Sequence, residues 1–452
     1  MADLDNQGQT PEVSTPSMPA VPLSHLRQVE QISRGSAPST RSPNHTLMVA
    51  LVAAVAAVIV IARRPDAFTN PQFYAEDGTD WFSDAYNYGP WQSLWIAYNG
   101  YYELLPRLTA LLGAPFDAAK SPLVYNLVGL LVQIVPVAVI ASRRFEALVP
   151  SLWARLAAGA AYLLIPSMEL NVTITNGLWH LAIIAFLVVI APPPTSRAWR
   201  AFDVLVVALC ALSGPFAYIM FPAAVVWWFV SRRRWALLLT CIFAVGLAVQ
   251  LYALSVSPRQ HPDVGASLRD FLLIVCDRIV LAGLLAEEGH THVFVASVPH
   301  STLIAAGICL LALPIVVYGA LRAPLELRLF ALVALAVVAA GLVLPLGPPG
   351  KAWGDYAFSS SGERYFFMAQ LAWVLTAMWA ASRIPVRWIK RVAWSTTGAG
   401  LLSGAITAWT YPAFVDYNWA QEANRIDTAR PGTHLVLTIP PGPPWAVDVT
   451  VK

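Results

Sequence analysis

Four acidic residues lie close together in the segment FYAEDGTDWFSDAYNY, residues 73–88: Glu76, Asp77, Asp80 and Asp84. The segment directly follows the first hydrophobic run of the chain. A carboxylate in such a position can take a proton from an acceptor hydroxyl or hold a divalent cation. We therefore predict the pair Glu76 and Asp77 as the catalytic acids, with a divalent cation as an open alternative. An ordinary solvated loop with helix-capping acids is the competing interpretation.

Aromatic and basic side chains follow the acids in the same loop, up to GYYELLPRL at residues 100–108. Flat rings suit the faces of sugars, although Trp and Tyr also gather at membrane interfaces for amphipathic reasons alone. Tyr102 is predicted to bind substrate. Arg107 is predicted to face a lipid phosphate, and a salt bridge from Arg107 to Glu103 or to one of the loop acids is the alternative.

Two later segments carry polar groups between apolar stretches. The segment ELNVTITNGLWH, residues 169–180, contains Asn176, Trp179 and His180. Polar groups at membrane depth line a cavity or close broken helices by hydrogen bonding, and both interpretations stay open. In GERYFF, residues 362–367, Arg364 and Tyr365 begin another apolar run, and Lys351 precedes it. Arg364 is predicted to clamp a phosphate as a planar fork, with an arginine that snorkels to the interface as the alternative.

The composition is that of a polytopic membrane protein. Hydrophobic residues make up 57% of the 452 residues and charged residues 12%, whereas soluble domains carry about 25% charge. The mean hydropathy is +0.58. The net charge of +3 comes without a basic stripe or a phosphate loop, so nucleic acid is not an expected partner. The four cysteines form no CxxC pair, and neither a zinc site nor a disulfide framework is indicated.

Hydrophobic periodicity predicts an all-α polytopic fold with about 11 hydrophobic helices, several of them too short to cross a bilayer, which takes about 20 residues. The predicted runs are 46–62, 121–141, 152–166, 177–192, 201–213, 215–231, 235–255, 301–321, 326–346, 366–382 and 391–410. Residues 152–192 and 201–231 are expected to form short broken hairpins, the second bending at Ser213-Gly214-Pro215. Residues 106–116 and 268–285 are expected to lie along the outer interface as helices.

Three parts of the chain are predicted. Residues 1–45 are rich in Pro, Ser, Thr and Gln and are expected to be a disordered cytoplasmic tail. Residues 46–410 form the transmembrane domain, with a first outer loop at 63–120 that holds the acidic motif and an outer loop at 256–300 that holds an interfacial helix. Residues 411–452 form an outer tail in which β-branched residues flank a Pro-Gly-Pro-Pro turn, which predicts a small β-ribbon.

Arginine distribution sets the expected orientation. Arg143-Arg144, Arg232–Arg234 and the set Arg383, Arg387, Lys390 and Arg391 fall in short turns on one side. Short basic loops prefer the cytoplasm. The amino terminus is therefore predicted to be cytoplasmic and the carboxyl terminus extracytoplasmic, in the inner (plasma) membrane of a bacterium. All the loops with candidate chemistry then lie outside.

The chain resembles the GT-C superfamily of membrane glycosyltransferases, which use polyprenyl-phosphate-linked sugars. The resemblance rests on the acidic motif after the first span, the short broken hairpins and the arginines at the outer ends of later spans. The phrases AEDG, GYYELLPRL, ITNGLWHLA, LSGPFA, GERYFF and PPGPPW are similar to a group of bacterial multi-pass proteins. The chain departs from several GT-C families in lacking a large soluble outer domain and in the Glu-Asp order of its acids.

The resemblance implies a glycosyltransferase, hexosyl or pentosyl, that moves a sugar from a polyprenyl-phosphate donor to an extracytoplasmic glycan or lipid acceptor. It implies Glu76 or Asp77 as the base and Arg364 as a phosphate ligand. Two alternatives stay open from the residues alone. One is a transporter or flippase of a lipid-linked sugar, in which the same side chains bind without reacting. The other is a non-catalytic membrane protein.

Overall fold

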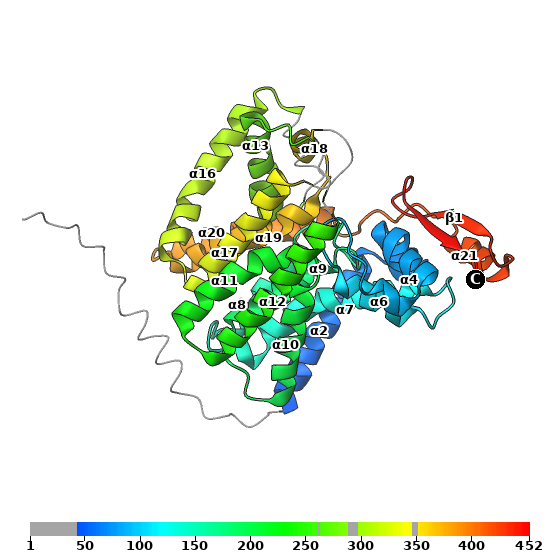
Figure 1. Ribbon diagram of the computed structural model, residues 1–452. Coiled ribbons are helices and arrows are strands. Elements are labelled where there is room, and N and C mark those ends of the chain that lie inside the picture. Colours follow the sequence, from blue (N-terminus) through cyan, green and yellow to red (C-terminus); the bar gives the residue numbers. More distant parts are fainter. Residues whose placement is uncertain (1–42, 258, 260–262, 288–296, 346–350) are drawn as a thin grey trace, which may run out of the picture. The chain divides into compact units, whose positions relative to one another are not determined.

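The computed structural model describes residues 43–257, 259, 263–287, 297–345 and 351–452. Helices dominate this part of the chain, and a two-stranded sheet lies near the carboxyl terminus (Figure 1). The tail predicted for residues 1–45 lies outside the described residues as far as Ser42. From Pro43 onward the chain is already helical, so the first helix begins earlier than its hydrophobic run predicts.

Six helices among the described residues are long and apolar enough to cross a membrane. They are α2 (Pro43–Arg63), α7 (Ser121–Ala141), α12 (Arg234–Val256), α16 (Ser301–Arg322), α17 (Leu325–Val343) and α19 (Glu363–Arg383). These helices support a membrane protein, and they match six of the predicted runs closely. The expectation of about 11 spans is not confirmed.

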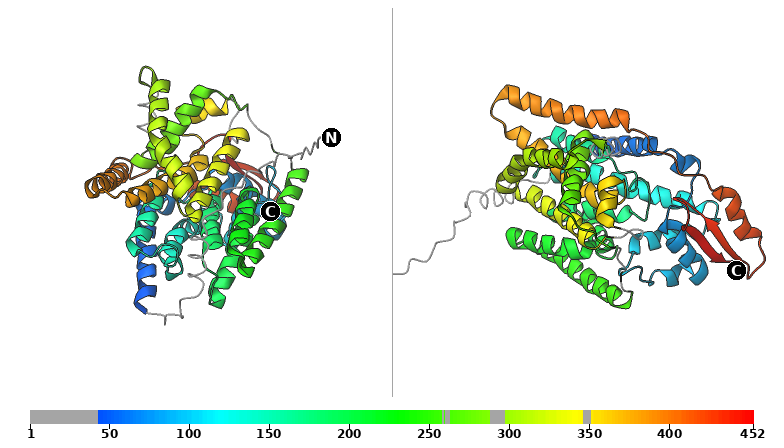
Figure 2. Two further views of the ribbon diagram at one scale, coloured as in Figure 1. Left: turned by 90° about the vertical axis from the view of Figure 1, so that its left-hand side faces the viewer. Right: turned by 90° about the horizontal axis from the view of Figure 1, so that it is seen from above.

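The other predicted runs are helices too, but each fails a requirement for a full crossing. Four are shorter than the roughly 20 residues that a bilayer requires: α8 (Leu152–Leu164), α9 (Gly177–Ile190), α10 (Arg197–Ala211) and α11 (Phe216–Ser231). The fifth, α20 (Arg387–Thr407), is long, but Arg387, Lys390 and Arg391 fill its first turns. It runs beside α19 (orange in Figure 2).

Two breaks interrupt the short helices, as the sequence predicts. The first break, residues 165–176, separates α8 from α9, and the second break, residues 212–215, separates α10 from α11. α8 and α9 pack mainly on α7 and α11 packs mainly on α12, whereas α10 packs equally on α12 and on α9. The long helices therefore support the broken ones. The two arms of each expected hairpin pack less on each other than on the long helix.

Short helices build the loop that follows α2. They are α3 (Asp66–Thr69), η1 (Asp77–Phe82), α4 (Ser83–Tyr88), α5 (Pro90–Ser93) and α6 (Leu104–Gly113). η1 is a π-helix, a wide turn that is rare and often found at functional sites. It begins at Asp77, so the acidic pair stands where the backbone enters this wide turn.

The carboxyl-terminal residues pack on this same loop. The strands β1 (His434–Thr438) and β2 (Ala446–Thr450) pair antiparallel, which confirms the predicted β-ribbon. β2 lies against η1 and α4 (red and blue in Figure 1). The helix α21 (Trp419–Thr428) places Trp419, 1% exposed, against Phe73 and Phe82. A Cβ on Gly78 would come within 2.6 Å of Ile439, so glycine is needed where the ribbon meets the acidic motif.

The segment expected as an outer interfacial helix at 268–285 is helical throughout. It comprises α13 (Leu268–Ile274), the π-helix η3 (Val275–Leu281) and α14 (Ala282–Leu285). Its beginning and Leu285 at its end are exposed, and most of the residues between are buried or half-buried. η3 packs against α16 and α19, and α13 packs against α18 (Ala352–Phe358). Arg278 is fully buried in η3 and donates to backbone carbonyls of Tyr356, Ser359, Ser360 and Ser361. Arg278 therefore caps the carboxyl-terminal end of α18.

Candidate functional site

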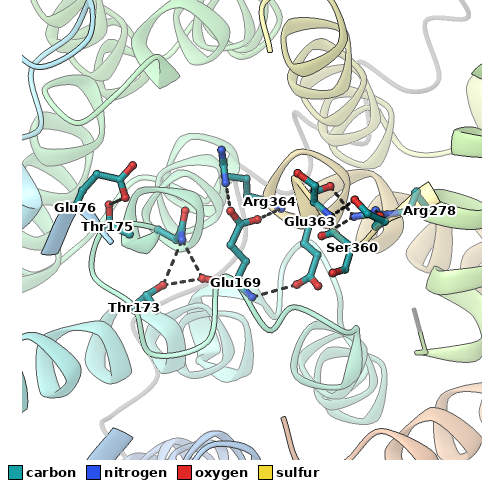
Figure 3. Close-up of polar contacts among 11 residues, drawn as sticks. Glu76, Glu169, Thr173, Thr175, Arg278, Ser360, Glu363 and Arg364 are labelled. Carbon is teal, nitrogen blue, oxygen red and sulfur yellow. Dashed lines mark hydrogen bonds and ion pairs between the residues drawn. The ribbon is translucent and has the colours of Figure 1, made fainter. Parts of the chain in front are cut away.

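Glu76 stands at the entrance to η1, where three distant segments meet. The preceding residue, Ala75, has a positive φ of 49°, and its N–H donates to the carbonyl of Pro440 at 2.7 Å. The tail thus holds the backbone in a left-handed conformation that a non-glycine residue rarely adopts. The Glu76 side chain is half-buried, and its carboxylate accepts a hydrogen bond from the Thr175 hydroxyl at 3.2 Å (Figure 3).

Asp77 has a different environment from its neighbour. It is 1% exposed, and its Oδ1 accepts the backbone N–H of Thr175 at 2.8 Å. Burial, and then the charge of Glu76, raises the pKa of Asp77 well above its usual range. The side chain therefore holds the end of the first break in place. Of the two predicted catalytic acids, Glu76 is the one that a substrate can reach.

The phenols of half-buried Tyr98 and buried Tyr101, together with a third acid, interact electrostatically with Glu76. Burial raises the pKa of Tyr98, and the charges of Glu76 and Asp80 raise it further. The backbones of Tyr98 and Tyr101 form a bridge, and the rings are 6.5 Å apart. Burial, followed by Glu76 and Asp84, raises the pKa of Asp80 to about 7. This acid is therefore placed to exchange a proton near neutral pH, beside the predicted base.

Arg364 lies at the start of α19 and pairs with Glu169 of the first break. One guanidinium nitrogen contacts Glu169 Oε1, and the backbone N–H of Arg364 donates to Oε2 at 3.2 Å. Glu169 in turn donates its N–H to Glu363 at 3.1 Å. Figure 3 shows Glu76, Thr175, Glu169 and Arg364 in a row. The charge of Glu76 acts on Arg364, and Thr175 and Glu169 stand between the two side chains in Figure 3. The guanidinium already has an acidic partner.

Arg107 forms a salt bridge to a loop acid, which is the alternative that the sequence left open. Its two terminal nitrogens both donate to Asp84 Oδ2 at 3.1 Å, and its guanidinium lies 5.0 Å from the Trp81 ring. The side chain is 1% exposed. A salt bridge to a loop acid, rather than contact with a lipid phosphate, therefore accounts for its position.

Asn176, at the end of the first break, and Trp179 and His180, in α9, make contacts with other groups of the protein. Asn176 donates to the carbonyl of Glu169 at 2.9 Å. His180 contacts the Tyr162 hydroxyl at 2.8 Å and the carbonyl of Leu170 at 3.1 Å. Trp179 packs edge-on against Phe216 and Tyr365. The side chains of Asn176, Trp179 and His180 are all buried. They close the broken helices by hydrogen bonding and packing, which is the second of the two interpretations that the sequence offered.

Three further predicted binding residues have mainly backbone or packing contacts. Tyr102 exchanges two backbone hydrogen bonds with the Gln250 side chain. The Tyr365 ring is 6% exposed and lies under the Arg364 guanidinium at 5.0 Å. Lys351 is exposed and bridges Asp263 through its backbone. The described contacts of Lys351 do not bring it to the carboxylates around Glu76.

Glu103, which the sequence suggested only as a partner for Arg107, interacts electrostatically with Glu76. It is 3% exposed, and its Oε2 has no hydrogen-bond partner within the described part of the chain. Burial, and then the charge of Glu76, raises its pKa well above the usual range. A glutamate between tyrosines and leucines, in YYELL, was the available signal. Thr175 had no signal at all, because its role depends on a fold that brings it to Glu76.

A metal centre does not stand out. In the ranges that the structure describes, no group of three or more His, Cys, Asp and Glu side chains is arranged to hold a metal ion. Comparisons with protein-family models, with curated proteins and with solved structures gave no match for this chain.

Proposed function

We propose that the protein is a membrane glycosyltransferase of the GT-C type. It would move a sugar from a polyprenyl-phosphate donor to an extracytoplasmic glycan or lipid acceptor. The observation that carries the proposal is the half-buried Glu76, whose charge acts on Arg364 and on the phenols of half-buried Tyr98 and buried Tyr101. One carboxylate, one guanidinium and several flat rings are the groups that a transfer from a lipid phosphate requires.

The proposed step uses Glu76 as the general base. Glu76 takes the proton of the acceptor hydroxyl while the hydroxyl oxygen bonds to the anomeric carbon of the sugar. The bond from that carbon to the phosphate oxygen breaks, and the electron pair leaves with the lipid phosphate. Arg364 stabilises the departing phosphate, which must share the guanidinium with Glu169. Asp77 holds the first break through Thr175 and takes no part in the proton transfer.

Paired substitutions test the roles of the two acids. In nanodiscs supplied with synthetic polyprenyl-phosphate sugars, Glu76→Gln is expected to lower the transfer rate about 10²–10⁴-fold, as loss of a general base does. Asp77→Asn keeps an oxygen that accepts the Thr175 N–H, and it is expected to retain most of the activity. Glu422→Gln, on the exposed surface of α21, is the matched control. Full activity of Glu76→Gln would rule out Glu76 as the general base, and absence of transfer by the wild type would make the transporter or flippase the better hypothesis.

The proposal includes an orientation. The acidic loop and the tail that packs on it are placed outside, with the amino terminus in the cytoplasm, because short basic turns prefer the cytoplasm. A cysteine introduced at Asn424, on exposed α21, is expected to react with an impermeant reagent in intact cells. The four native cysteines must be replaced first. Labelling only after the membrane is permeabilised would reverse the orientation.

A further inference from the structure

A second site lies away from the acidic loop, among the ends of several helices. A cavity of about 330 Å³ is lined by α7, α8, α9, α17, α19 and α20. Most of its lining is aliphatic or aromatic, including Val137, Ile183, Phe330 and Leu375. The volume falls within the range of roughly 300–1,000 Å³ for small-molecule sites. None of the residues that line it belongs to the group around Glu76 and Arg364.

Arg155 gives this apolar cavity a buried positive charge. Its side chain is 4% exposed, and one terminal nitrogen donates to the carbonyls of Ala141 and Ser142, at the end of α7. No ion pair joins Arg155 to an acid in the described ranges, and its Nε is buried without a partner. The two carbonyls are only partial charges. A buried guanidinium without a counter-charge is costly, so an anion is the missing component.

A second donor in the lining leads to the same conclusion. The indole Nε1 of Trp379, on α19, is also buried without a hydrogen-bond partner in the part of the chain described. Arg155 Nε and Trp379 Nε1 can only donate. A ligand that satisfies both must offer acceptor oxygens together with a hydrocarbon body. The one acid of the lining, Glu326, is partly exposed at the start of α17, where solvent and the helix dipole stabilise its charge.

We propose that this cavity binds one membrane phospholipid, with its phosphate at Arg155 and one hydrocarbon chain along the apolar lining. The lipid phosphate supplies the anion, and its ester carbonyls supply further acceptors. Contact with hydrocarbon alone gives no selectivity in a bilayer, because surrounding lipid tails are equally apolar. The phosphate must therefore account for the recognition. This inference is independent of the proposed transfer reaction.

Native mass spectrometry of the full chain tests the site. The purified protein is incubated with phosphatidylglycerol or with diacylglycerol of the same chains. The wild type is expected to retain one phosphatidylglycerol and to bind diacylglycerol much less. Arg155→Gln is expected to weaken phosphatidylglycerol binding about 10–100-fold, as loss of a charge-assisted hydrogen bond does. Equal binding of diacylglycerol, or an unchanged Arg155→Gln, would overturn the proposal.

Further variants separate the lipid site from a purely structural role of Arg155. Because Arg155 also caps α7, Ala158→Trp is made to fill the cavity and leave the guanidinium in place, and it is expected to abolish lipid retention. Arg197→Gln removes an exposed arginine and should bind lipid as the wild type does. A photoreactive aromatic residue in place of Phe330, which lines the cavity, is expected to form an adduct with phospholipid. An adduct with a peptide from residues 1–42 would instead show that the chain fills its own cavity.

Discussion

The two breaks in the short helices solve one physical problem in different ways. Backbone groups released from a helix inside an apolar environment must find other partners. At the first break, Gln133 of α7 donates to Asn171 and accepts the N–H of Val172. At the second break, Gln250 of α12 bonds the carbonyl of Ala211 and both backbone groups of Tyr102. A buried glutamine on the supporting long helix therefore satisfies each break.

The breaks differ in what they present beyond their backbone. The second break is only residues 212–215, and its contacts with the loop are made by backbone groups and by the Ser213 hydroxyl, which accepts from Leu105. The first break spans residues 165–176 and places Glu169 beside Arg364 and Thr175 beside Glu76. A longer break offers side chains as well as backbone to its neighbours. Structure is therefore the expected role of the second break, and chemistry that of the first.

The largest expected effect comes from removing the glutamine of the second break. Gln250→Leu leaves the Tyr102 N–H and the Ala211 carbonyl without this partner, and each buried unsatisfied group costs about 1–3 kcal/mol. We expect a free energy of unfolding lower by roughly 2–6 kcal/mol, measured by thermal melting in detergent. Gln133→Leu should lower stability and also the transfer rate, since it releases the first break. Gln421→Leu, on exposed α21, is the control, and equal stability of Gln250→Leu would contradict the assignment.

A smaller effect is expected from pH, through Asp80, on which the charge of Glu76 acts. The pKa of Asp80 rises from 3.8 to about 7 in the folded protein. Its proton is bound more tightly in the folded state, so this contribution to stability is fully present below pH 3.8 and is lost as pH rises through 7. Allowing for solvent screening, up to about 3 kcal/mol is involved. Between pH 5 and pH 8 the melting temperature of the wild type should fall, and that of Asp80→Asn should change less. Parallel curves would show that Asp80 titrates normally.

The smallest effect is expected at the hydroxyl that links the first break to Glu76. Thr175→Val removes the hydrogen bond to the Glu76 carboxylate and keeps the backbone N–H that Asp77 accepts. Loss of one such bond, worth about 0.5–1.5 kcal/mol, should slow transfer by about 2–12-fold with little change in melting temperature. Thr396→Val, whose hydroxyl bonds only within exposed α20, is the control. If Thr175→Val is unstable but transfers sugar at the normal rate, the first break has a structural role, as the second break does.

The sequence by itself determined the helices and their breaks. The apolar run at 121–141 reproduces α7 residue for residue, and the bend at Ser213-Gly214-Pro215 falls inside the second break. The β-branched residues around Pro440–Pro444 form the ribbon. These features depend on local properties: hydrophobic runs, backbone preferences and turn residues. Length alone also indicated that some helices are too short to cross a bilayer.

Only the tertiary structure decided which side chains meet. The sequence offered Glu76 and Asp77 as equals, and burial separated them because the Thr175 backbone lies over Asp77. For Arg107 it left a lipid phosphate and a salt bridge open, and the fold chose Asp84; for Arg364 it named no acidic partner, and the fold supplied Glu169. The cavity at Arg155 left no mark in the sequence, because residues from six helices line it. Contacts between residues far apart in the chain depend on packing, and local periodicity carries no record of the partner.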